Sequence, residues 1–394
     1  MAAIAHRTSI ERLETRTLFS VLKVGPTEPY KEPSAAIAAA HDGDTILIDP
    51  GTYNDVALIN KNNLTIEGDG PVRSVIKTNG AVYGEKGLWV FQQGFKNLTV
   101  DNIDFEGARV SVADGNNGAG IRDQGTNLTI LNCRFYNNQD GILGGNSVVG
   151  GLGTVTIKNS EFADNGITSD GLTHNVYISD RGATLIFEFN YTHNTVVGHL
   201  LKSRCAVNEI LYNRISDDTG TGSYEIDLPN GGRDDIVGNI IQQSATSQNK
   251  IIVSYGEEGS LIAGSQLNVV NNTIVNDATS GTFILAKNLP TGFRVDVKNN
   301  IFAGPGTPLS VNGVNQSVTG NGNVVTTVAG AKFVNAAAYN FQLLAGSPAI
   351  NVGVAPGTDS AGFSLTPVDE YVFPTDWQKR PVNGQLDAGA YEFV

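Results

Sequence analysis

The sequence predicts an all-β protein, a right-handed parallel β-helix in which short strands wind into stacked coils. Gly is abundant, at 46 of 394 residues, which exceeds the roughly 7% share in an average protein. Only 16% of residues are charged, against roughly 25% in a typical domain. Short segments of alternating apolar residues recur at intervals of roughly 22–32 residues, as in a solenoid. Together these observations favour stacked short strands over a helical bundle or a disordered chain.

One phrase recurs along the chain: a turn Asn or Gly, alternating apolar residues, Asn, then an aromatic residue or Ile. Period-two alternation predicts strands and excludes helices in these units. Asn tolerates a left-handed backbone at a bend, and equivalent Asn residues of successive coils are expected to form a ladder. A β-sandwich, the alternative architecture, would not repeat one phrase in register. The clearest copies are 97–105, 127–135, 154–162, 267–274 and 295–302.

The ends of the chain differ from the repeats. Residues 1–24 are interpreted as an export or sorting segment: they carry Arg7, Arg12 and Arg16 but lack the apolar core of an ordinary signal peptide. A short amphipathic helix is the alternative interpretation. Residues 25–394 are predicted to form a single β-helix domain. Within it we expect a capping helix at 33–41, coils over 44–330 and a closing region at 331–394.

Composition excludes several classes of function. The net charge of −13 makes non-specific binding of nucleic acid unfavourable, because no basic surface exists to displace counterions. No apolar run approaches the roughly 20 residues of a membrane-spanning helix. Cys133 and Cys205 lie far apart in strand-like segments, and we expect two small buried side chains rather than a disulfide.

Charged residues interrupt the repeat between 170 and 258. Alternation places five side chains on one outer face: Tyr177, Lys202, Arg204, Glu225 and Asp227. In this phase Tyr177, Lys202 and Glu225 stack on successive coils, each about 4.8 Å from the next. Arg204 and Asp227 form a second column beside them. Such a face is suited to an extended anionic chain.

Further polar residues lie near these two columns. His174 and His199 flank the starts of the strands, while Tyr191 and His193 precede the strand of Lys202. In the coil after Asp227, alternation places Ile252 and Ser254 inside and Val253 and Tyr255 outside. Asn230 lies in the sharp turn after Asp227. The structural alternative is that the charged residues form cross-strand ion pairs, worth about 0.2–1 kcal/mol each.

Several segments resemble known β-helix proteins. Residues 33–53 resemble the entry segment of pectin-lyase-like β-helix proteins, in which the helix caps the first coil. Residues 340–350 and 387–393 resemble the closing motifs of secreted bacterial β-helix proteins, and 10–20 resemble the start of many exported bacterial proteins. The segment 174–259 resembles one bacterial β-helix subfamily, through His174-Asn-Val-Tyr177, Val197-Gly-His-Leu-Leu-Lys-Ser-Arg204, Ser223-Tyr-Glu-Ile-Asp-Leu-Pro-Asn-Gly-Gly232 and Ile252-Val-Ser-Tyr-Gly-Glu-Glu-Gly259.

The wider resemblance to pectate, alginate and chondroitin-B lyases implies β-elimination on a uronic-acid polysaccharide by a secreted or cell-surface bacterial protein. That chemistry needs a cation near the sugar carboxylate, a base and an acid. Arg204 suits the carboxylate, Lys202 or His199 the base, and Tyr177 or Tyr191 the acid. No cofactor is required, although Ca²⁺ at Glu225 and Asp227 is the metal site we consider. We expect the remaining residues to bind substrate: His174, His193, Glu225, Asp227, Asn230 and Tyr255.

Three other functions fit the same face. Glu225 and Asp227 could act as the acid and base of a glycoside hydrolase, although neighbouring cations would lower the pKa of the acid. A C5-epimerase would use the same proton abstraction as a lyase. A carbohydrate-binding adhesin would need exposed aromatic platforms, and Trp89 and Trp377 lie far apart in the sequence.

Overall fold

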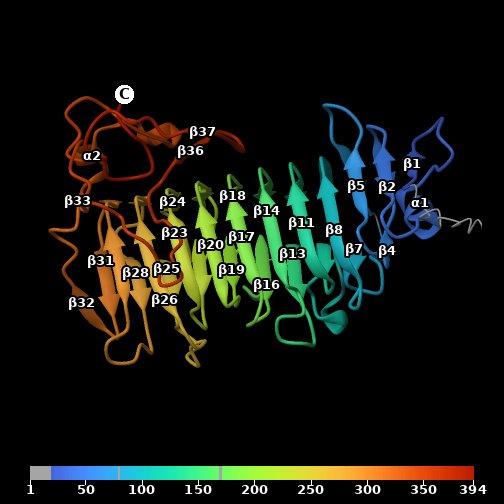
Figure 1. The fold of residues 1–394 in the computed structure, drawn as a ribbon, viewed down its shortest axis with the longest axis horizontal. Helices are drawn as coiled ribbons and strands as arrows, with labels where there is room; N and C mark the ends of the chain where they lie inside the picture. The colour runs from blue at the N-terminus through green and yellow to red at the C-terminus, as the bar shows by residue number, and fades with distance from the viewer. Residues whose placement is uncertain (1–18, 79, 168–170) are drawn as a thin grey trace, which may run out of the picture.

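The computed structural model describes residues 19–78, 80–167 and 171–394, and the chain is a right-handed parallel β-helix, as predicted (Figure 1). Three sheets of 11 strands run along the solenoid, and each strand pairs with the equivalent strand of the next coil. The pairing is parallel throughout these sheets except between β31 and β32, the last two strands of one of them. Each coil therefore contributes one strand to each of three walls.

The three walls are here called sheets A, B and C. Sheet A contains β1 (Val21–Val24), β2 (Thr45–Ile48), β5 (Thr65–Gly68), β8 (Lys96–Asp101), β11 (Thr126–Leu131), β14 (Thr154–Lys158), β17 (Thr184–Glu188), β20 (Val207–Leu211), β23 (Arg233–Val237), β26 (Gln266–Val270) and β29 (Val295–Lys298). Sheet B contains β3 (Thr52–Asn54), β6 (Ser74–Lys77), β9 (Ile103–Glu106), β12 (Arg134–Tyr136), β15 (Glu161–Ala163), β18 (Tyr191–His193), β21 (Arg214–Ser216), β24 (Ile240–Gln243), β27 (Thr273–Asn276), β30 (Ile301–Ala303) and β33 (Val324–Thr326). Sheet C contains β4 (Ala57–Ile59), β7 (Gly87–Phe91), β10 (Ala119–Asp123), β13 (Asp140–Gly145), β16 (Val176–Ser179), β19 (Leu201–Ser203), β22 (Ile226–Leu228), β25 (Ile251–Tyr255), β28 (Thr282–Ala286), β31 (Thr307–Val311) and β32 (Val314–Gln316).

The solenoid begins slightly earlier than the sequence predicts. β1 pairs in parallel with β2, so residues 21–24 belong to the first coil rather than to the N-terminal segment. Most of the predicted export segment, 1–18, lies outside the described residues. The helix α1 (Pro33–Ala39) occupies the predicted position, and it buries Ala36 and Ile37. None of the described helices is long and apolar enough to cross a membrane.

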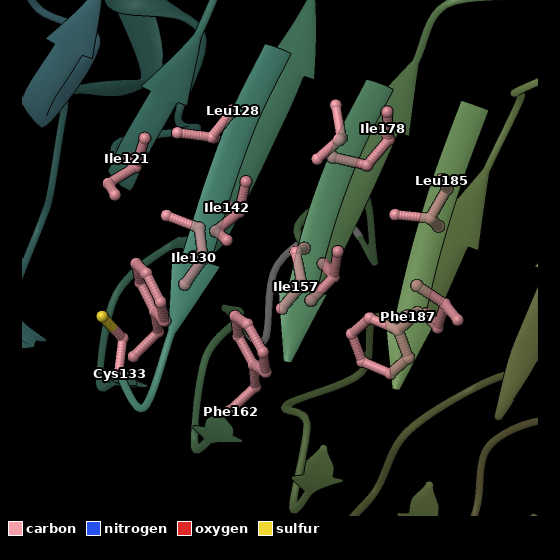
Figure 2. Close-up of a cluster of buried hydrophobic side chains, with 14 of the residues drawn as sticks. Ile121, Leu128, Ile130, Cys133, Ile142, Ile157, Phe162, Ile178, Leu185 and Phe187 are labelled. Atoms are coloured by element: carbon pink, nitrogen blue, oxygen red, sulfur yellow. The ribbon is translucent and has the colours of Figure 1, made fainter. Parts of the chain in front are cut away.

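The interior is filled by columns of identical or similar side chains. Phe105, Phe135 and Phe162 stack with ring centroids 4.9 Å apart, which matches the spacing between coils. Figure 2 shows part of this interior, where Phe162 and Phe187 pack together with Ile and Leu side chains from neighbouring coils. Cys133 and Cys205 are buried free thiols in the described chain, as expected, and burial raises the pKa of each to about 12.

A buried Asn ladder follows the bend between sheets A and B. At Asn213 the backbone N–H and the side-chain amide both donate to Asn239 Oδ1, and Asn239 donates in the same way to Asn272. The residue before each ladder position takes the left-handed conformation, for example Asn271 with φ 54°. Two roles were predicted for Asn, the left-handed bend and the ladder, and they fall on consecutive residues. The ladder runs through Asn190, Asn213, Asn239, Asn272, Asn300 and Asn323.

The closing region folds back along the solenoid near its C-terminal end (Figure 1). It is tied to the bend between sheets A and B: Asn159 Nδ2 donates to Thr375 O at 2.8 Å, and Ala390 N donates to Thr273 Oγ1 at 3.0 Å. Its segments therefore lie against coils that are distant in the sequence. The elements of this region are α2 (Val328–Ala331), β34 (Phe333–Asn335), β35 (Asn340–Leu343), β36 (Asp369–Val372) and β37 (Asp376–Lys379). A short 3-10 turn at Ala336–Ala338 also belongs to it, and another lies outside it at Val112–Asp114.

Candidate functional site

Four consecutive strands of sheet C carry a polar column on their outer face. The parallel register pairs Tyr177 with Lys202, Lys202 with Asp227, and Asp227 with Ser254. The prediction that Tyr177 and Lys202 are stacked neighbours is confirmed. The third member of the column is Asp227 rather than Glu225, because β22 is paired two residues further along than the sequence alignment placed it.

Lys202 is the central cation of the column. Its Nζ lies 3.2 Å from Asp227 Oδ2 and 3.5 Å from Glu258 Oε1, and it stands 5.5 Å from the centre of the Tyr177 ring. Burial raises the pKa of Asp227, although the Lys202 ammonium acts in the opposite direction. The predicted Lys202–Glu225 pair is replaced by these two contacts. A lysine ammonium that is paired with two carboxylates is suited to binding an anionic group. It is not suited to removing a proton from a substrate.

Arg204 follows β19 and forms the most connected group of the site. Its Nε donates to the Tyr177 hydroxyl at 2.7 Å, and its Nη1 donates to Asn230 Oδ1 at 2.6 Å. Its two terminal nitrogens also contact both oxygens of Glu258, at 2.9 Å and 2.7 Å. This is the two-point geometry with which arginine recognises a carboxylate. The hydrogen bond from Arg204 is the main reason that the pKa of Glu258 is lowered.

Two histidines lie behind the column. His174 Nδ1 accepts a hydrogen bond from the His199 backbone N–H at 3.0 Å, which leaves the His174 proton on Nε2. Burial and the nearby Lys202 ammonium lower the pKa of His199 to about 3, and burial together with His199 lowers the pKa of His174 well below its usual value. Both rings are therefore neutral at physiological pH. His199 Nδ1 lies 3.6 Å from Asp227 Oδ2.

Glu225 does not face the outer surface, contrary to the prediction. It is fully buried one residue before β22, where the chain is still turning into the strand, as are Asn175 and Leu200 at the same position of the two preceding coils. Alternation fails there because it applies only inside a strand. Burial raises the pKa of Glu225 well above its usual value, and the nearby Asp217 acts in the same direction.

Tyr255 is also placed wrongly by the sequence. The register pairs it with Leu228, an interior residue, while Ser254 pairs with Asp227 on the outer face. Tyr255 is fully buried and its hydroxyl donates to Gly232 O at 3.0 Å. The phase of β25 is inverted because Ile251, Ile252 and Val253 form a continuous apolar run, from which alternation cannot be read.

Tyr191 and His193 belong to a different wall. They lie on β18 of sheet B, so they do not join Lys202 on sheet C. The two rings stack with centroids 3.9 Å apart, Tyr191 bonds Asp218, and His193 Nε2 lies 3.1 Å from Glu161. Their order in the chain suggests that they belong to the site, because β18 and β19 are consecutive, but the intervening bend turns their side chains to another face.

The residues considered for calcium do not fit the ion. Glu225 turns into the interior toward Gln243, whereas Asp227 faces Lys202. Among the residues that the structure describes, no group of three or more His, Cys, Asp or Glu could hold a metal. The same separation removes Glu225 and Asp227 as the acid and base of a hydrolase, because they do not flank one exposed space.

The acidic turn after β25 belongs to the site but was not predicted from the sequence. Glu258 contacts both cations of the site, while Glu257 accepts hydrogen bonds from Lys287 Nζ at 2.6 Å and from the Tyr224 hydroxyl at 2.9 Å. The signal was present, because both residues stand inside the Ile252–Gly259 motif. Their distance along the chain from Lys202 hid the contact.

The face can therefore bind a carboxylate and place titratable groups beside it. The side chain of Arg204 is 19% exposed and that of Lys202 is 13% exposed, so both are held firmly yet reach the surface. Glu258, at 47%, is the most exposed member. The structure brings six predicted residues together here: His174, Tyr177, His199, Lys202, Arg204 and Asp227, with Asn230 at the edge.

Comparison with known proteins gives only distant likenesses. No protein-family model matches the sequence, and none of the curated proteins matches it. The solved structure of pectate lyase Pel9A is similar over 95% of this chain and 96% of that chain, with 15% identity and a TM-score of 0.47. A pectin methylesterase from Aspergillus niger is similar over 78% of this chain and 83% of that chain, with 11% identity and a TM-score of 0.35. At these values neither likeness assigns an activity to this chain.

Proposed function

We propose that the protein is a polysaccharide lyase that cleaves a uronic-acid polysaccharide by β-elimination, with the sheet C face as its active site. One observation carries the proposal: Arg204 and Lys202 already hold a carboxylate, that of Glu258, with two-point geometry at the arginine. Each uronic-acid unit of such a polymer carries the same group at C6. A substrate carboxylate in the place of Glu258 would be neutralised by both cations, which makes the adjacent C5 proton more acidic.

In β-elimination a base removes the C5 proton, and the electron pair left on C5 forms the C4=C5 double bond. The bond between C4 and the leaving oxygen O4 breaks, and O4 takes up a proton. We assign the proton on O4 to Tyr177. Arg204 donates to its hydroxyl at 2.7 Å, so negative charge left on that oxygen is stabilised.

We assign the base to His199. Its neutral ring can accept a proton, and Asp227 lies close enough to stabilise the imidazolium that results, which opposes the lowering of the His199 pKa by burial. A proton on Nδ1 would face Asp227, leaving Nε2 as the acceptor atom. His174 would position His199 through the 3.0 Å hydrogen bond to its backbone N–H, and Asn230 would position Arg204.

The proposed substrate class also indicates where the protein acts. A polymer of this kind does not cross a membrane, so we propose that the protein acts in the secreted state or at the cell surface of a bacterium. No step of the proposed reaction uses a metal or another cofactor. The acidic polysaccharide is the partner that the two cations select.

The proposal is tested by incubating the protein with a panel of uronic-acid polymers, including pectate, alginate and chondroitin sulfate. Elimination produces chain ends with a C4=C5 double bond, which absorb in the ultraviolet. New reducing ends without that absorbance would instead indicate hydrolysis, and inversion at C5 without chain cleavage would indicate an epimerase. Binding without any of these products would make the protein a carbohydrate-binding surface protein.

A further inference from the structure

The outer face of sheet B carries a second charged column, remote from the sheet C site. Successive coils place Asp104, Arg134, Glu161, Tyr191 and Arg214 in one register. Arg134 Nε lies 3.3 Å from Glu161, and Glu161 lies 3.1 Å from His193. Arg134 is therefore paired with carboxylates of both neighbouring coils, whereas the residue that follows Arg214 in register is Ile240.

Arg214 is a buried cation with unused hydrogen-bond donors. Its side chain is only 8% exposed. Within the described part of the chain, its one hydrogen-bond acceptor is Asp218, at 2.9 Å from Nη2, and its Nε is buried without a partner. The guanidinium instead lies against three aromatic rings, those of Tyr191, Tyr339 and Phe373, at 4.6–5.5 Å from their centres. A guanidinium with five donors and one acceptor can still bind an oxygen-rich ligand.

This arginine lies in the wall of a pocket of about 380 Å³ between sheet B and the closing region. That volume is at the small end of ligand pockets, which span roughly 300–1,000 Å³. Phe373 stands at the pocket with 63% of its surface exposed, while Tyr371 is buried. The lining includes Arg214, Tyr339, Gln342, Tyr371, Phe373 and Tyr391.

The lining is chemically selective. Aromatic rings pack against the C–H face of a sugar ring, and the side-chain amide of Gln342 can bond sugar hydroxyls. Arg214, the one charged residue of the lining, adds a preference for a carboxylate. Residues from four separate segments, β21, β24, 338–342 and 371–391, build the pocket, so it exists only when the closing region is docked.

We propose that this pocket is a second carbohydrate site, which binds one or two sugar units bearing a carboxylate. It shares no residue with the sheet C face and lies on another wall of the solenoid. It would hold an acidic chain end or a released product while the sheet C face holds the polymer. Binding at the pocket does not depend on catalysis, so it stands even if the elimination chemistry is wrong.

Calorimetric titration tests the site, in an Arg204→Ala background that removes the carboxylate fork of sheet C. The probes are D-galacturonate, D-glucuronate and their dimers, with D-galactose as the neutral analogue. We expect a Kd on the order of 1 mM for the acidic sugars, which is typical of so few contacts. Adding Phe373→Ala should weaken binding by about tenfold, and adding Arg214→Gln by roughly ten- to a hundredfold.

Two further variants keep the test independent of folding. Gln342→Ala alters an exposed lining residue and should weaken binding without changing the melting temperature. Tyr83→Ala removes a partly exposed aromatic ring far from the pocket and should leave binding unchanged. Equal affinity for galactose would overturn the carboxylate preference. Unchanged affinity in both Phe373→Ala and Gln342→Ala, or no binding of any probe, would overturn the site itself.

Discussion

Arg204 and Glu258 form a two-point ion pair across two coils of sheet C, with N–O distances of 2.9 Å and 2.7 Å. Arg204 is held from behind by Tyr177 and Asn230, so its position does not depend on Glu258. Glu258 is about half exposed on the turn after β25. The cation is therefore fixed and the carboxylate is replaceable, which is the arrangement of a binding site filled by the protein's own acidic residue.

The first prediction concerns Glu258→Gln. A neutral amide competes poorly for the fork, so a substrate carboxylate should bind more easily, and KM for a uronic-acid polymer should fall by roughly tenfold with kcat unchanged. Glu257→Gln is the matched control, because its contacts are to Lys287 and Tyr224 rather than to Arg204. A fall in kcat with KM unchanged would show that Glu258 takes part in the chemistry instead.

The second prediction concerns Arg204→Lys, which keeps the charge but loses the fork. Lysine cannot contact both oxygens of a carboxylate or reach Tyr177 in the same geometry, so kcat/KM should fall by about a hundredfold. The thermal transition should move by only a few degrees, because the lost contacts to Tyr177, Asn230 and Glu258 lie at the surface of the solenoid and leave its apolar interior unchanged. Arg294→Lys is the control, at an exposed ion pair with Asp296. Retention of full activity by Arg204→Lys would contradict the binding role.

The third prediction concerns the buried Asn ladder. Asn239→Ala leaves the Asn213 backbone N–H and side-chain amide without their acceptor, in a bend that excludes water. We expect unfolding free energy to fall by about 2–4 kcal/mol, measured by denaturant titration. Asn127→Gly, in the exposed ladder with Asn97, keeps the left-handed backbone of that position and should cost less than about 1 kcal/mol. Equal losses of unfolding free energy in the two variants would mean that burial does not determine how much a ladder hydrogen bond stabilises the fold.

The fourth prediction concerns pH. Burial raises the pKa of Asp123 to about 8 and that of Asp217 to about 7. A raised carboxyl pKa means that the folded protein holds its proton more tightly than the unfolded chain. The stability from such a group is complete below pH 4 and is lost as pH rises toward the folded pKa. The protein should therefore unfold more easily at pH 8.5 than at pH 5.

Asp123→Asn isolates one of these groups, because the amide resembles the protonated carboxyl and cannot ionise. Its unfolding free energy should match that of the wild type only below pH 4, and the difference should widen with rising pH to several kcal/mol at pH 8.5. Glu67→Gln, at an exposed position of β5, serves as the control and should not change the pH dependence. If the unfolding free energy of Asp123→Asn fell with pH as steeply as that of the wild type, Asp123 would be ionised in the folded protein.

The sequence predicts the fold well because each coil of a solenoid repeats the same sequence pattern. The alternating apolar residues of 97–105 and 127–135 recur with Asn at the same bend, and the structure places those residues in equivalent strands. Register along a coil is harder. It was predicted for Tyr177 and Lys202, whose strands alternate clearly, but not for Tyr255, which follows a run of three apolar residues.

The remaining errors concern strand ends and contacts between residues that lie far apart in the sequence. Glu225 turns inward because it precedes its strand, and a period-two pattern carries no information before a strand begins. Glu258 meets Arg204 from two coils away, and Arg214 meets Tyr339 and Phe373 from the closing region. Such contacts depend on how separate segments dock, so composition and spacing do not predict them.

The most direct test of the central claim is mass spectrometry of the products formed from a uronic-acid polymer in water enriched in heavy oxygen. Elimination adds no water, so the account predicts unlabelled fragments whose new non-reducing ends are lighter by one water molecule. The Arg204→Ala variant should give none. Fragments that carry the heavy oxygen, and lack the double bond, would show hydrolysis and contradict the account.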